Sequence, residues 1–297
     1  MEFKKSKLVS FLLVSVVFIL TLAGCSKSDE IVVGGKDYSE QYVMSEMLEI
    51  LIDENTDLKT RIEDNLSGPV IFESIKNDEV DLYLEYVGSV LSNMHLGLDG
   101  DSDELLDKAK TALDEELDIT WLENYGYNNT YAMVVTKETA EEYDLETTSD
   151  LAEVGDELVL GADHTFTERD DGYPGLSERY DFDFKEVKGM EPALMYQAID
   201  QGDVDVIAGY TTEGRIIAFD LVILEDDKDF FPPYDAAPII RNEVLEEHPE
   251  LEDVLNSLAG RIDEEKMSEL NAEVDLEERE PHDVAREFLE EEGLIDK

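Results

Sequence analysis

The sequence predicts an α/β protein made of two similar lobes. Short runs of β-branched or apolar residues alternate along the chain with segments whose apolar residues recur at helical spacing. This alternation is typical of a mostly parallel sheet that is flanked by helices. It occurs as two successive series, and the second begins near Ala132. We therefore expect two α/β lobes that are joined by extended segments and hold a ligand between them.

The first series begins with a strand over 31–33, which Gly34 and Gly35 should close with a tight turn. A helix follows over about 39–53. Lys36 stands between them, at the carboxyl end of a strand and beside a helix N-terminus, where α/β sheets bind ligands. The other elements are a strand near 60–63, a helix near 69–76, an apolar run over 80–83 that continues into 85–89, a helix over roughly 102–116 and a strand over 119–121.

The second series begins with a strand over 132–135. Its other elements are a helix near 138–143, a strand near 158–161, a helix over 192–201 and strands over 204–208 and 221–224. The strand over 221–224 is expected to be the last one, and a helical tail follows from Asn242. The sequence shows no internal repeat and no low-complexity tract.

The N-terminal residues have the pattern of an export signal. Three lysines precede an apolar run over 8–22, which is shorter than the roughly 20 apolar residues of a membrane span. Leu22-Ala23-Gly24-Cys25 resembles the bacterial lipobox, where the signal is cut before a cysteine that carries a diacylglycerol. We expect a signal peptide over 1–24, a lipidated tether over 25–30 and an anchor to the outer face of the membrane. The alternative is an ordinary signal peptide with a chance cysteine.

Cysteine content and charge narrow the classes of partner. Cys25 is the single cysteine, so disulfides and Cys-ligated metals are excluded. The chain has 23 Lys and Arg against 76 Asp and Glu, a net charge of −53, and loss of residues 1–24 with three lysines and one glutamate changes this to −55. Nucleic acid and anionic membrane surfaces are therefore poor partners. An acidic solvated surface suits a halophilic protein, because salt screens its self-repulsion.

Motifs for covalent or metal chemistry do not occur in the sequence. It has no nucleophile elbow, P-loop, His-Glu-x-x-His pattern or complete calcium loop. A metal site built from dispersed histidines and acids stays an alternative: these are His95, His164, His248 and His282. Asp99, Asp101 and Asp103 surround Gly100, but no glutamate follows at the twelfth loop position, so we expect a solvated turn. No catalytic residue, metal or cofactor is expected.

Four tyrosines stand at strand ends or turns, and these are Tyr86, Tyr131, Tyr210 and Tyr234. Composition alone favours ordinary packing for each of them. The functional alternative is a cage for a quaternary ammonium group, which cannot donate hydrogen bonds and is held by the negative faces of aromatic rings.

Six motifs occur in order along the chain: Gly-Gly-Lys-x-Tyr-Ser-Glu-Gln at 34–41, Asp-Leu-Tyr-Leu-Glu-Tyr-Val-Gly-Ser at 81–89, Asn-Asn-Thr-Tyr at 128–131, Phe-Thr-Glu-Arg-Asp-Asp-Gly-Tyr-Pro-Gly-Leu at 166–176, Gly-Tyr-Thr-Thr-Glu-Gly-Arg-Ile at 209–216 and Asp-Asp-Lys-Asp-Phe-Phe-Pro-Pro-Tyr-Asp-Ala-Ala-Pro at 226–238. Together they resemble the substrate-binding proteins of osmoprotectant ABC transporters, which deliver glycine betaine, proline betaine, carnitine or choline. The resemblance covers essentially the whole mature chain.

The resemblance implies a role for each candidate residue. The tyrosine box of that family encloses the trimethylammonium group, which assigns this role to the four tyrosines. Lys36, Arg169 and Ser89 would hold the carboxylate of a betaine, because Arg can make two parallel N–H bonds and Lys supplies a point charge. An ion pair with an acidic neighbour is the alternative for Arg169. Gln41 and Asn129 are weaker candidates for lining the pocket.

Two positions depart from the family pattern. Ser89 stands where threonine or aspartate is usual, and Val87 replaces a common threonine. An aspartate would repel a carboxylate and favour choline, whereas a neutral hydroxyl is compatible with betaine or carnitine.

The resemblance implies a two-lobed periplasmic-binding-protein fold of type II, with the ligand in the interlobe cleft. We expect lobe I over 30–130 plus 235–297 and lobe II over 131–234, with hinges near Thr130 and Tyr234. The expected function is that of a monomeric receptor, not an enzyme, which gives a quaternary amine, glycine betaine first, to ABC permease subunits. The alternatives are a receptor for an amino acid or other small zwitterion on this fold, and a lipoprotein hydrolase.

Overall fold

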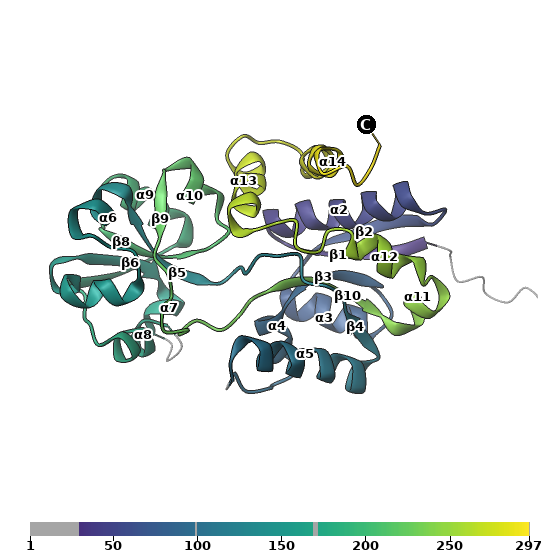
Figure 1. The fold of residues 1–297 in the computed structure, drawn as a ribbon, viewed down its shortest axis with the longest axis horizontal. Helices are drawn as coiled ribbons and strands as arrows, with labels where there is room; N and C mark the ends of the chain where they lie inside the picture. The colour runs from purple at the N-terminus through teal and green to yellow at the C-terminus, as the bar shows by residue number, and fades with distance from the viewer. Residues whose placement is uncertain (1–29, 99, 169–171, 297) are drawn as a thin grey trace, which may run out of the picture.

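The computed structural model describes residues 30–98, 100–168 and 172–296, and they form two lobes with one five-stranded sheet each (Figure 1). The predicted signal peptide, Cys25 and Arg169 lie outside the described residues. In lobe I the strand order is β2 (Lys59–Leu66), β1 (Glu30–Lys36), β3 (Leu82–Tyr86), β10 (Ala236–Arg241) and β4 (Ile119–Trp121). In lobe II it is β7 (Glu186–Met190), β6 (Val159–Asp163), β8 (Val206–Tyr210), β5 (Tyr131–Thr136) and β9 (Leu221–Ile223).

Each sheet is mostly parallel and has one reversed strand. β1 pairs in parallel with β2 and β3, whereas β10 runs antiparallel to both β3 and β4. In lobe II, β6 pairs in parallel with β7 and β8, whereas β5 runs antiparallel to both β8 and β9. The reversed strands β5 and β10 are those that follow the two crossings between the lobes.

Helices cover both faces of each sheet, as Figure 1 shows. In lobe I, α2 packs with the C-terminal helices on one face, and α3, α4 and α5 pack on the other. The helices of lobe I are α2 (Ser39–Asn55), α3 (Gly68–Lys76), α4 (Val87–Asn93), α5 (Ser102–Leu117), α11 (Asn242–Glu247), α12 (Glu250–Asn256), α13 (Glu264–Asp275) and α14 (Pro281–Glu291). Those of lobe II are α6 (Lys137–Tyr143), α7 (His164–Glu168), α8 (Tyr173–Tyr180), α9 (Pro192–Asp200) and α10 (Gly214–Ala218), with short 3₁₀ turns over Thr148–Glu153 and Gly155–Glu157.

The two lobes repeat one parallel unit of three strands. Strands β2, β1 and β3 in lobe I correspond in order and direction to β7, β6 and β8 in lobe II. An aspartate before the third strand makes the same pair of bonds in each unit. Asp81 accepts from the amide of Val32 at 2.9 Å and donates its own amide to Val32, and Asp205 does the same with Val159 at 2.8 Å.

The strands β1 and β7 differ from the sequence-based expectation. β1 continues through Gly34 and Gly35 to Lys36 instead of turning there. A Cβ on Gly34 would lie 2.9 Å from the side chains of Ile71 and Val80, so glycine allows close packing of α3 on the strand. β7 was not predicted because it is a half-exposed edge strand without an apolar run.

The expectation that the strand over 221–224 is the last one was wrong, because β10 follows it. Pro238 argues against a central strand, since proline has no backbone N–H. In the structure β4 pairs with residues 239–241 of β10 and ends before Pro238, whose carbonyl accepts from the amide of Leu122 at 3.0 Å. The short β4 therefore makes a proline tolerable inside this sheet.

Two segments of the chain cross between the lobes, and one pair of helices also packs across them. The two crossing segments are joined by an antiparallel bridge between Asn128 and Asp235. The amide of Tyr234 also donates to Oδ1 of Asn128 at 2.6 Å. Helix α13 of lobe I also packs against α10 of lobe II. A Cβ on Gly214 would lie 2.6 Å from the backbone nitrogen of Ala272, so this helix contact needs glycine. Among the described helices, none has the length and apolar character that crossing a membrane requires.

Candidate functional site

A cavity of about 550 Å³ lies between the lobes, at the carboxyl ends of β3 and β8. Both sheets therefore present to it the edge at which α/β proteins bind ligands. Its lining residues are Tyr38, Ser39 and Glu40 at the start of α2, Tyr86 and Ser89 at the β3–α4 junction, Asn129 and Tyr234 on the crossing segments, Tyr210 and Thr212 to Arg215 in lobe II, and Asn271 and Asp275 on α13.

Three of the four predicted tyrosines line this cavity. Tyr86 and Tyr210 are the last residues of β3 and β8, the equivalent third strands of the two repeated units. Tyr234 packs near Tyr86 with 6.4 Å between ring centroids. The cavity is therefore bounded by aromatic rings from both lobes.

The fourth predicted tyrosine, Tyr131, does not line the cavity and packs against Tyr210. It lies opposite Tyr210 across the β5–β8 pair, with ring centroids 4.6 Å apart. The hydroxyl of Tyr210 donates to that of Tyr131 at 2.8 Å, and Tyr131 donates to Oδ2 of Asp163 at 3.0 Å. Burial, followed by the bond with Tyr210, raises the pKa of Tyr131. This chain of bonds fixes the ring of Tyr210.

Gly88 allows Tyr234 to reach the cavity. It belongs to the first turn of α4, and a Cβ on it would lie 2.6 Å from Cζ of the Tyr234 ring. Any larger residue at position 88 would overlap that ring. Glycine at position 88 is therefore a packing requirement of this part of the cavity wall.

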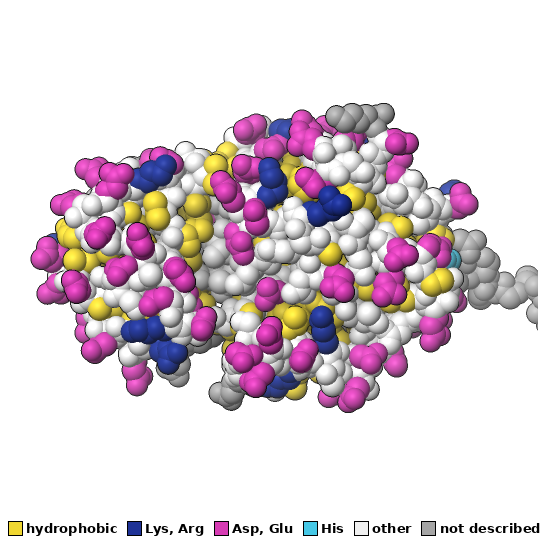
Figure 2. Space-filling model, viewed as in Figure 1, with side chains coloured by type: hydrophobic (Ala, Val, Ile, Leu, Met, Phe, Trp, Pro, Cys, Tyr) yellow, Lys and Arg dark blue, Asp and Glu magenta, His cyan; other side chains and the backbone are white. Residues whose placement is uncertain are grey.

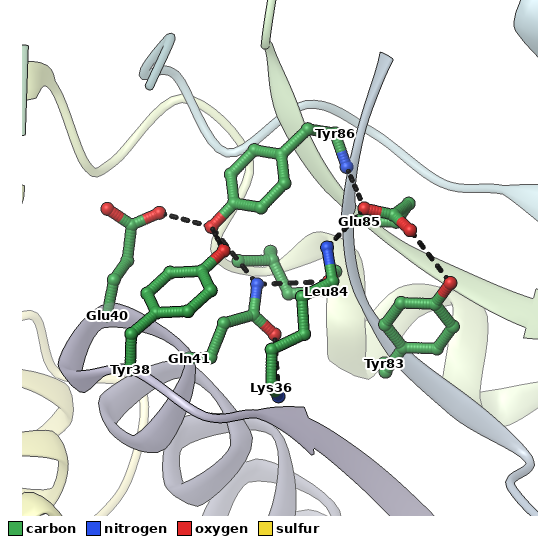
Figure 3. Close-up of polar contacts among 8 residues, drawn as sticks. All are labelled: Lys36, Tyr38, Glu40, Gln41, Tyr83, Leu84, Glu85 and Tyr86. Atoms are coloured by element: carbon green, nitrogen blue, oxygen red, sulfur yellow. Dashed lines mark hydrogen bonds and ion pairs between the residues drawn. The ribbon is translucent and has the colours of Figure 1, made fainter. Parts of the chain in front are cut away.

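Tyr86 joins a buried polar network at the base of the cavity (Figure 3). Its hydroxyl accepts from Tyr38 and from Nε2 of Gln41, both at 3.0 Å, and donates to Oε1 of Glu40 at 2.5 Å. Burial, and next the charge of Glu40, raise the pKa of Tyr86 well above its ordinary value. Tyr86 is thus a neutral donor with a fixed ring orientation.

Glu40 connects the network to the other lobe. It is 2% exposed and lies in the first turn of α2. Its Oε2 accepts from Thr212 of lobe II at 2.7 Å, from Nδ2 of Asn129 at 3.2 Å and from Nδ2 of Asn271 at 3.5 Å. One carboxylate therefore contacts both lobes, a crossing segment and α13.

The structure differs from the expectation for Lys36. Its side chain is buried and does not line the cavity, because its ammonium pairs with Oε1 of Glu85 at 2.5 Å. Glu85 is fully buried and also accepts from the hydroxyl of Tyr83 and the amide of Tyr86, each at 2.8 Å. Figure 3 shows Glu85 and Glu40 on opposite sides of Tyr86. Lys36 therefore neutralises a buried carboxylate, and its predicted contact with a ligand carboxylate stays a prediction.

The other predicted residues divide into two groups. Ser89 and Asn129 line the cavity. Gln41 lies behind Tyr86, where its Nε2 also donates to the carbonyl of Leu84 at 3.2 Å. For Arg169 the expected contact with a carboxylate stays a prediction, because this residue lies outside the described ranges.

Sequence reasoning missed several residues that line the cavity: Tyr38, Glu40, Thr212, Glu213, Arg215, Asn271 and Asp275. Most of them stand inside the motifs at 34–41 and 209–216, so the motifs themselves were the available signal. Asn271 and Asp275 come from a helical tail that carried no such signal. Arg215 pairs with Glu213 at 2.5 Å, and burial raises the pKa of Glu213 while Arg215 opposes that rise.

The lining of the cavity contains no histidine or cysteine among the described residues. No group of three or more His, Cys, Asp and Glu side chains with metal-binding geometry occurs in the described part of the chain. A larger cavity of about 630 Å³ lies near the amino end of β1. It has no Tyr, Phe or Trp in its described lining, and its Arg241 is paired with Asp78 and Asp81 at 2.8 Å each. We therefore place the site between the lobes.

Comparison with known proteins identifies similar chains. Residues 29–291 match the family model OpuAC, described as the substrate-binding domain of an ABC-type glycine betaine transport system. The chain is 38% identical over 288 residues to the carnitine transport binding protein OpuCC of Listeria monocytogenes, covering 95% of this chain and 93% of that one. It is 32% identical to a glycine-betaine-binding protein of Pseudomonas aeruginosa, covering 93% and 92%.

A solved structure has the same fold. A crystal structure titled as a glycine betaine/carnitine/choline ABC transporter is 37% identical and superimposes with a TM-score of 0.87. The match covers 90% of this chain and all of that one. The two-lobed α/β fold predicted from the sequence is confirmed by this similarity.

Proposed function

Because this chain belongs to the family of substrate-binding domains of ABC-type glycine betaine transport systems, we propose that its interlobe cavity captures a quaternary ammonium compatible solute. The observation that carries this proposal is the placement of Tyr86, Tyr210 and Tyr234, from both lobes, around one cavity. A trimethylammonium group cannot donate hydrogen bonds, and the negative faces of tyrosine rings attract it. The lobes close around it, because each contributes only part of the cage.

The receptor works outside the cytoplasm and gives its ligand unchanged to the permease subunits of an ABC transporter. It acts as a monomer, needs no cofactor and catalyses no covalent step. Cys25, after a signal peptide over 1–24, carries the lipid that holds it to the outer face of the membrane. Lobe I consists of 30–130 plus 235–297 and lobe II of 131–234, which move about hinges near Thr130 and Tyr234.

The preference for glycine betaine now depends on fewer residues than the sequence suggested. Lys36 is neutralised by Glu85, so Arg169 is left as the basic residue, of the two predicted, that would hold a carboxylate. Ser89 and Asn129 line the cavity and offer it neutral hydrogen bonds. We keep the quaternary amine as the ligand class and glycine betaine as its expected first member.

Calorimetry with glycine betaine, carnitine, proline betaine and choline tests this function. At least one of the four should bind and be recovered intact. Tyr234→Ala should weaken binding several-fold, since one cation–π contact contributes about 0.5–2 kcal/mol, and Tyr234→Phe should weaken it less. Binding of an amino acid in place of all four amines, or turnover of the ligand, would contradict the proposal.

The lipid anchor has a separate test. Thioether lipidation requires the sulfur of Cys25, the one cysteine of the chain. Cys25→Ala should move the protein from the membrane fraction to the soluble fraction and leave ligand binding unchanged. Equal fractionation of the two proteins would reject the anchor and would not affect the proposed ligand.

A further inference from the structure

We propose that Glu40 is the counter-charge for the ammonium group of the ligand, so that the cavity selects a cationic head group by charge as well as by its aromatic faces. This inference rests on the proposed function and deepens it by assigning a residue that determines specificity.

Glu40 is buried although it belongs to the cavity wall. The residue is 2% exposed, yet it lines the same cavity as the three cage tyrosines. Its hydrogen-bond donors are a tyrosine and a threonine hydroxyl and two asparagine amides, all of them neutral. They hold the carboxylate in place and leave its charge uncompensated.

Glu85 differs from Glu40 in having a cationic partner. Both carboxylates are buried next to Tyr86, and Glu85 has the ammonium of Lys36 at 2.5 Å. No described Lys or Arg lies within ion-pair distance of Glu40. A buried charge without a partner costs several kcal/mol. The position of Glu40 in the first turn of the 17-residue helix α2 offsets part of that cost.

The other charged residues of the described cavity wall are paired or exposed. Arg215 is the basic residue of the described lining, and it is engaged by Glu213 at 2.5 Å. Asp275 is exposed at the end of α13 and accepts from the hydroxyl of Ser39. Among the described residues of the cavity wall, Glu40 is therefore the buried charge without an ion-pair partner. A quaternary ammonium held between the rings would supply the missing partner.

The test compares choline with its tert-butyl analogue, in which a carbon atom replaces the quaternary nitrogen. The analogue keeps the shape of the head group and lacks the charge. Calorimetry gives the dissociation constants of both compounds for the parent protein and for Glu40→Gln, which keeps the side-chain length. The preference for choline should fall about tenfold or more in the variant, while the affinity for the analogue stays close to that of the parent.

Glu49→Gln is the matched control. It makes the same substitution on the same helix, at a half-buried position outside the cavity wall, and should leave the preference for choline unchanged. Glu40→Asp, which keeps the charge, should retain most of the preference. For a variant that is destabilised, binding is followed by the shift in melting temperature that each ligand causes. The ligand stabilises the folded protein by an amount that depends on the ratio of its concentration to its dissociation constant.

Three results would overturn the inference. Equal losses for choline and the analogue in Glu40→Gln would mean that Glu40 only shapes the cavity. An unchanged preference would mean that its charge is not sensed by the ligand. A variant that stays unfolded with either compound present would assign Glu40 to the fold. Failure of the parent protein to bind any quaternary amine would instead reject the proposed function, and this inference with it.

Discussion

Lys36 and Glu85 form a buried ion pair next to the cage, with side chains that are 7% and 0% exposed. The pair lies behind Tyr86, and the ammonium of Lys36 is 4.6 Å from the centroid of that ring. Loss of one partner from such a pair leaves an uncompensated buried charge, whereas loss of both does not. The pair is therefore a structural support for the cage.

Lys36→Met should lower the free energy of unfolding by about 3–5 kcal/mol, because it leaves Glu85 without a partner. Lys36→Met combined with Glu85→Gln should recover much of that loss and bind glycine betaine with nearly the parental affinity. Denaturant unfolding and calorimetry check the two parts. A double variant that is as stable as the parent but has lost binding would show that Lys36 contacts the ligand directly, as the sequence suggested.

At the scale of single elements, the β3–α4 junction shapes one side of the cavity wall. Tyr86 ends the strand, Gly88 lies in the next turn, and the ring of Tyr234 from the second crossing segment packs over that glycine. The junction thus positions two cage rings, one directly and one by leaving space for it.

Gly88→Ala should displace the ring of Tyr234 and weaken binding of a quaternary amine about two- to thirty-fold, the equivalent of one cation–π contact. Overpacking should cost about 1–3 kcal/mol of stability. Gly68→Ala is the matched control, because a Cβ at that position meets no atom within 4 Å. Calorimetry on both variants checks the expectation, and equal affinities for them would show that Tyr234 does not depend on Gly88.

At the scale of the whole molecule, the surface is dominated by acidic side chains. Figure 2 shows Asp and Glu distributed over both lobes, with far fewer Lys and Arg between them. The net charge of −53 makes the folded state repel itself. Salt shortens the Debye length to about 3 Å at 1 M and thereby weakens this repulsion.

The melting temperature should rise as NaCl or KCl increases from about 0.1 to 1 M, because screening acts over that range. The two salts should act alike, since screening depends on ionic strength. Calorimetric or fluorescence melting checks this. A flat response to both chlorides, with stabilisation by sulfate alone, would show that strengthened apolar burial and not charge screening controls stability.

Much of this architecture could be predicted from the sequence, because local patterns depend on residues that are close along the chain. Apolar periodicity located α2, α5 and β4, and the ordered motifs identified the family and three tyrosines that line the cavity. The repeated unit of the two lobes was invisible as a sequence repeat. The equivalence of the two units shows in the pair of hydrogen bonds that Asp81 makes in one lobe and Asp205 in the other. Many different sequences can form this geometry, so the two lobes need not be similar in sequence.

Tertiary structure decided which charged groups meet. Lys36 and Glu85 are 49 residues apart, and Glu40 is 231 residues from Asn271. The sequence by itself determined that Lys36 and Glu40 lie where the carboxyl end of a strand is followed by the N-terminus of a helix. Only the packing of β3 against β1 and of α13 against α2 gave the lysine a buried partner and surrounded the glutamate, among the described residues, with neutral donors. The free energy of a buried charge depends on the groups that surround it in space, and adjacency along the chain does not specify them.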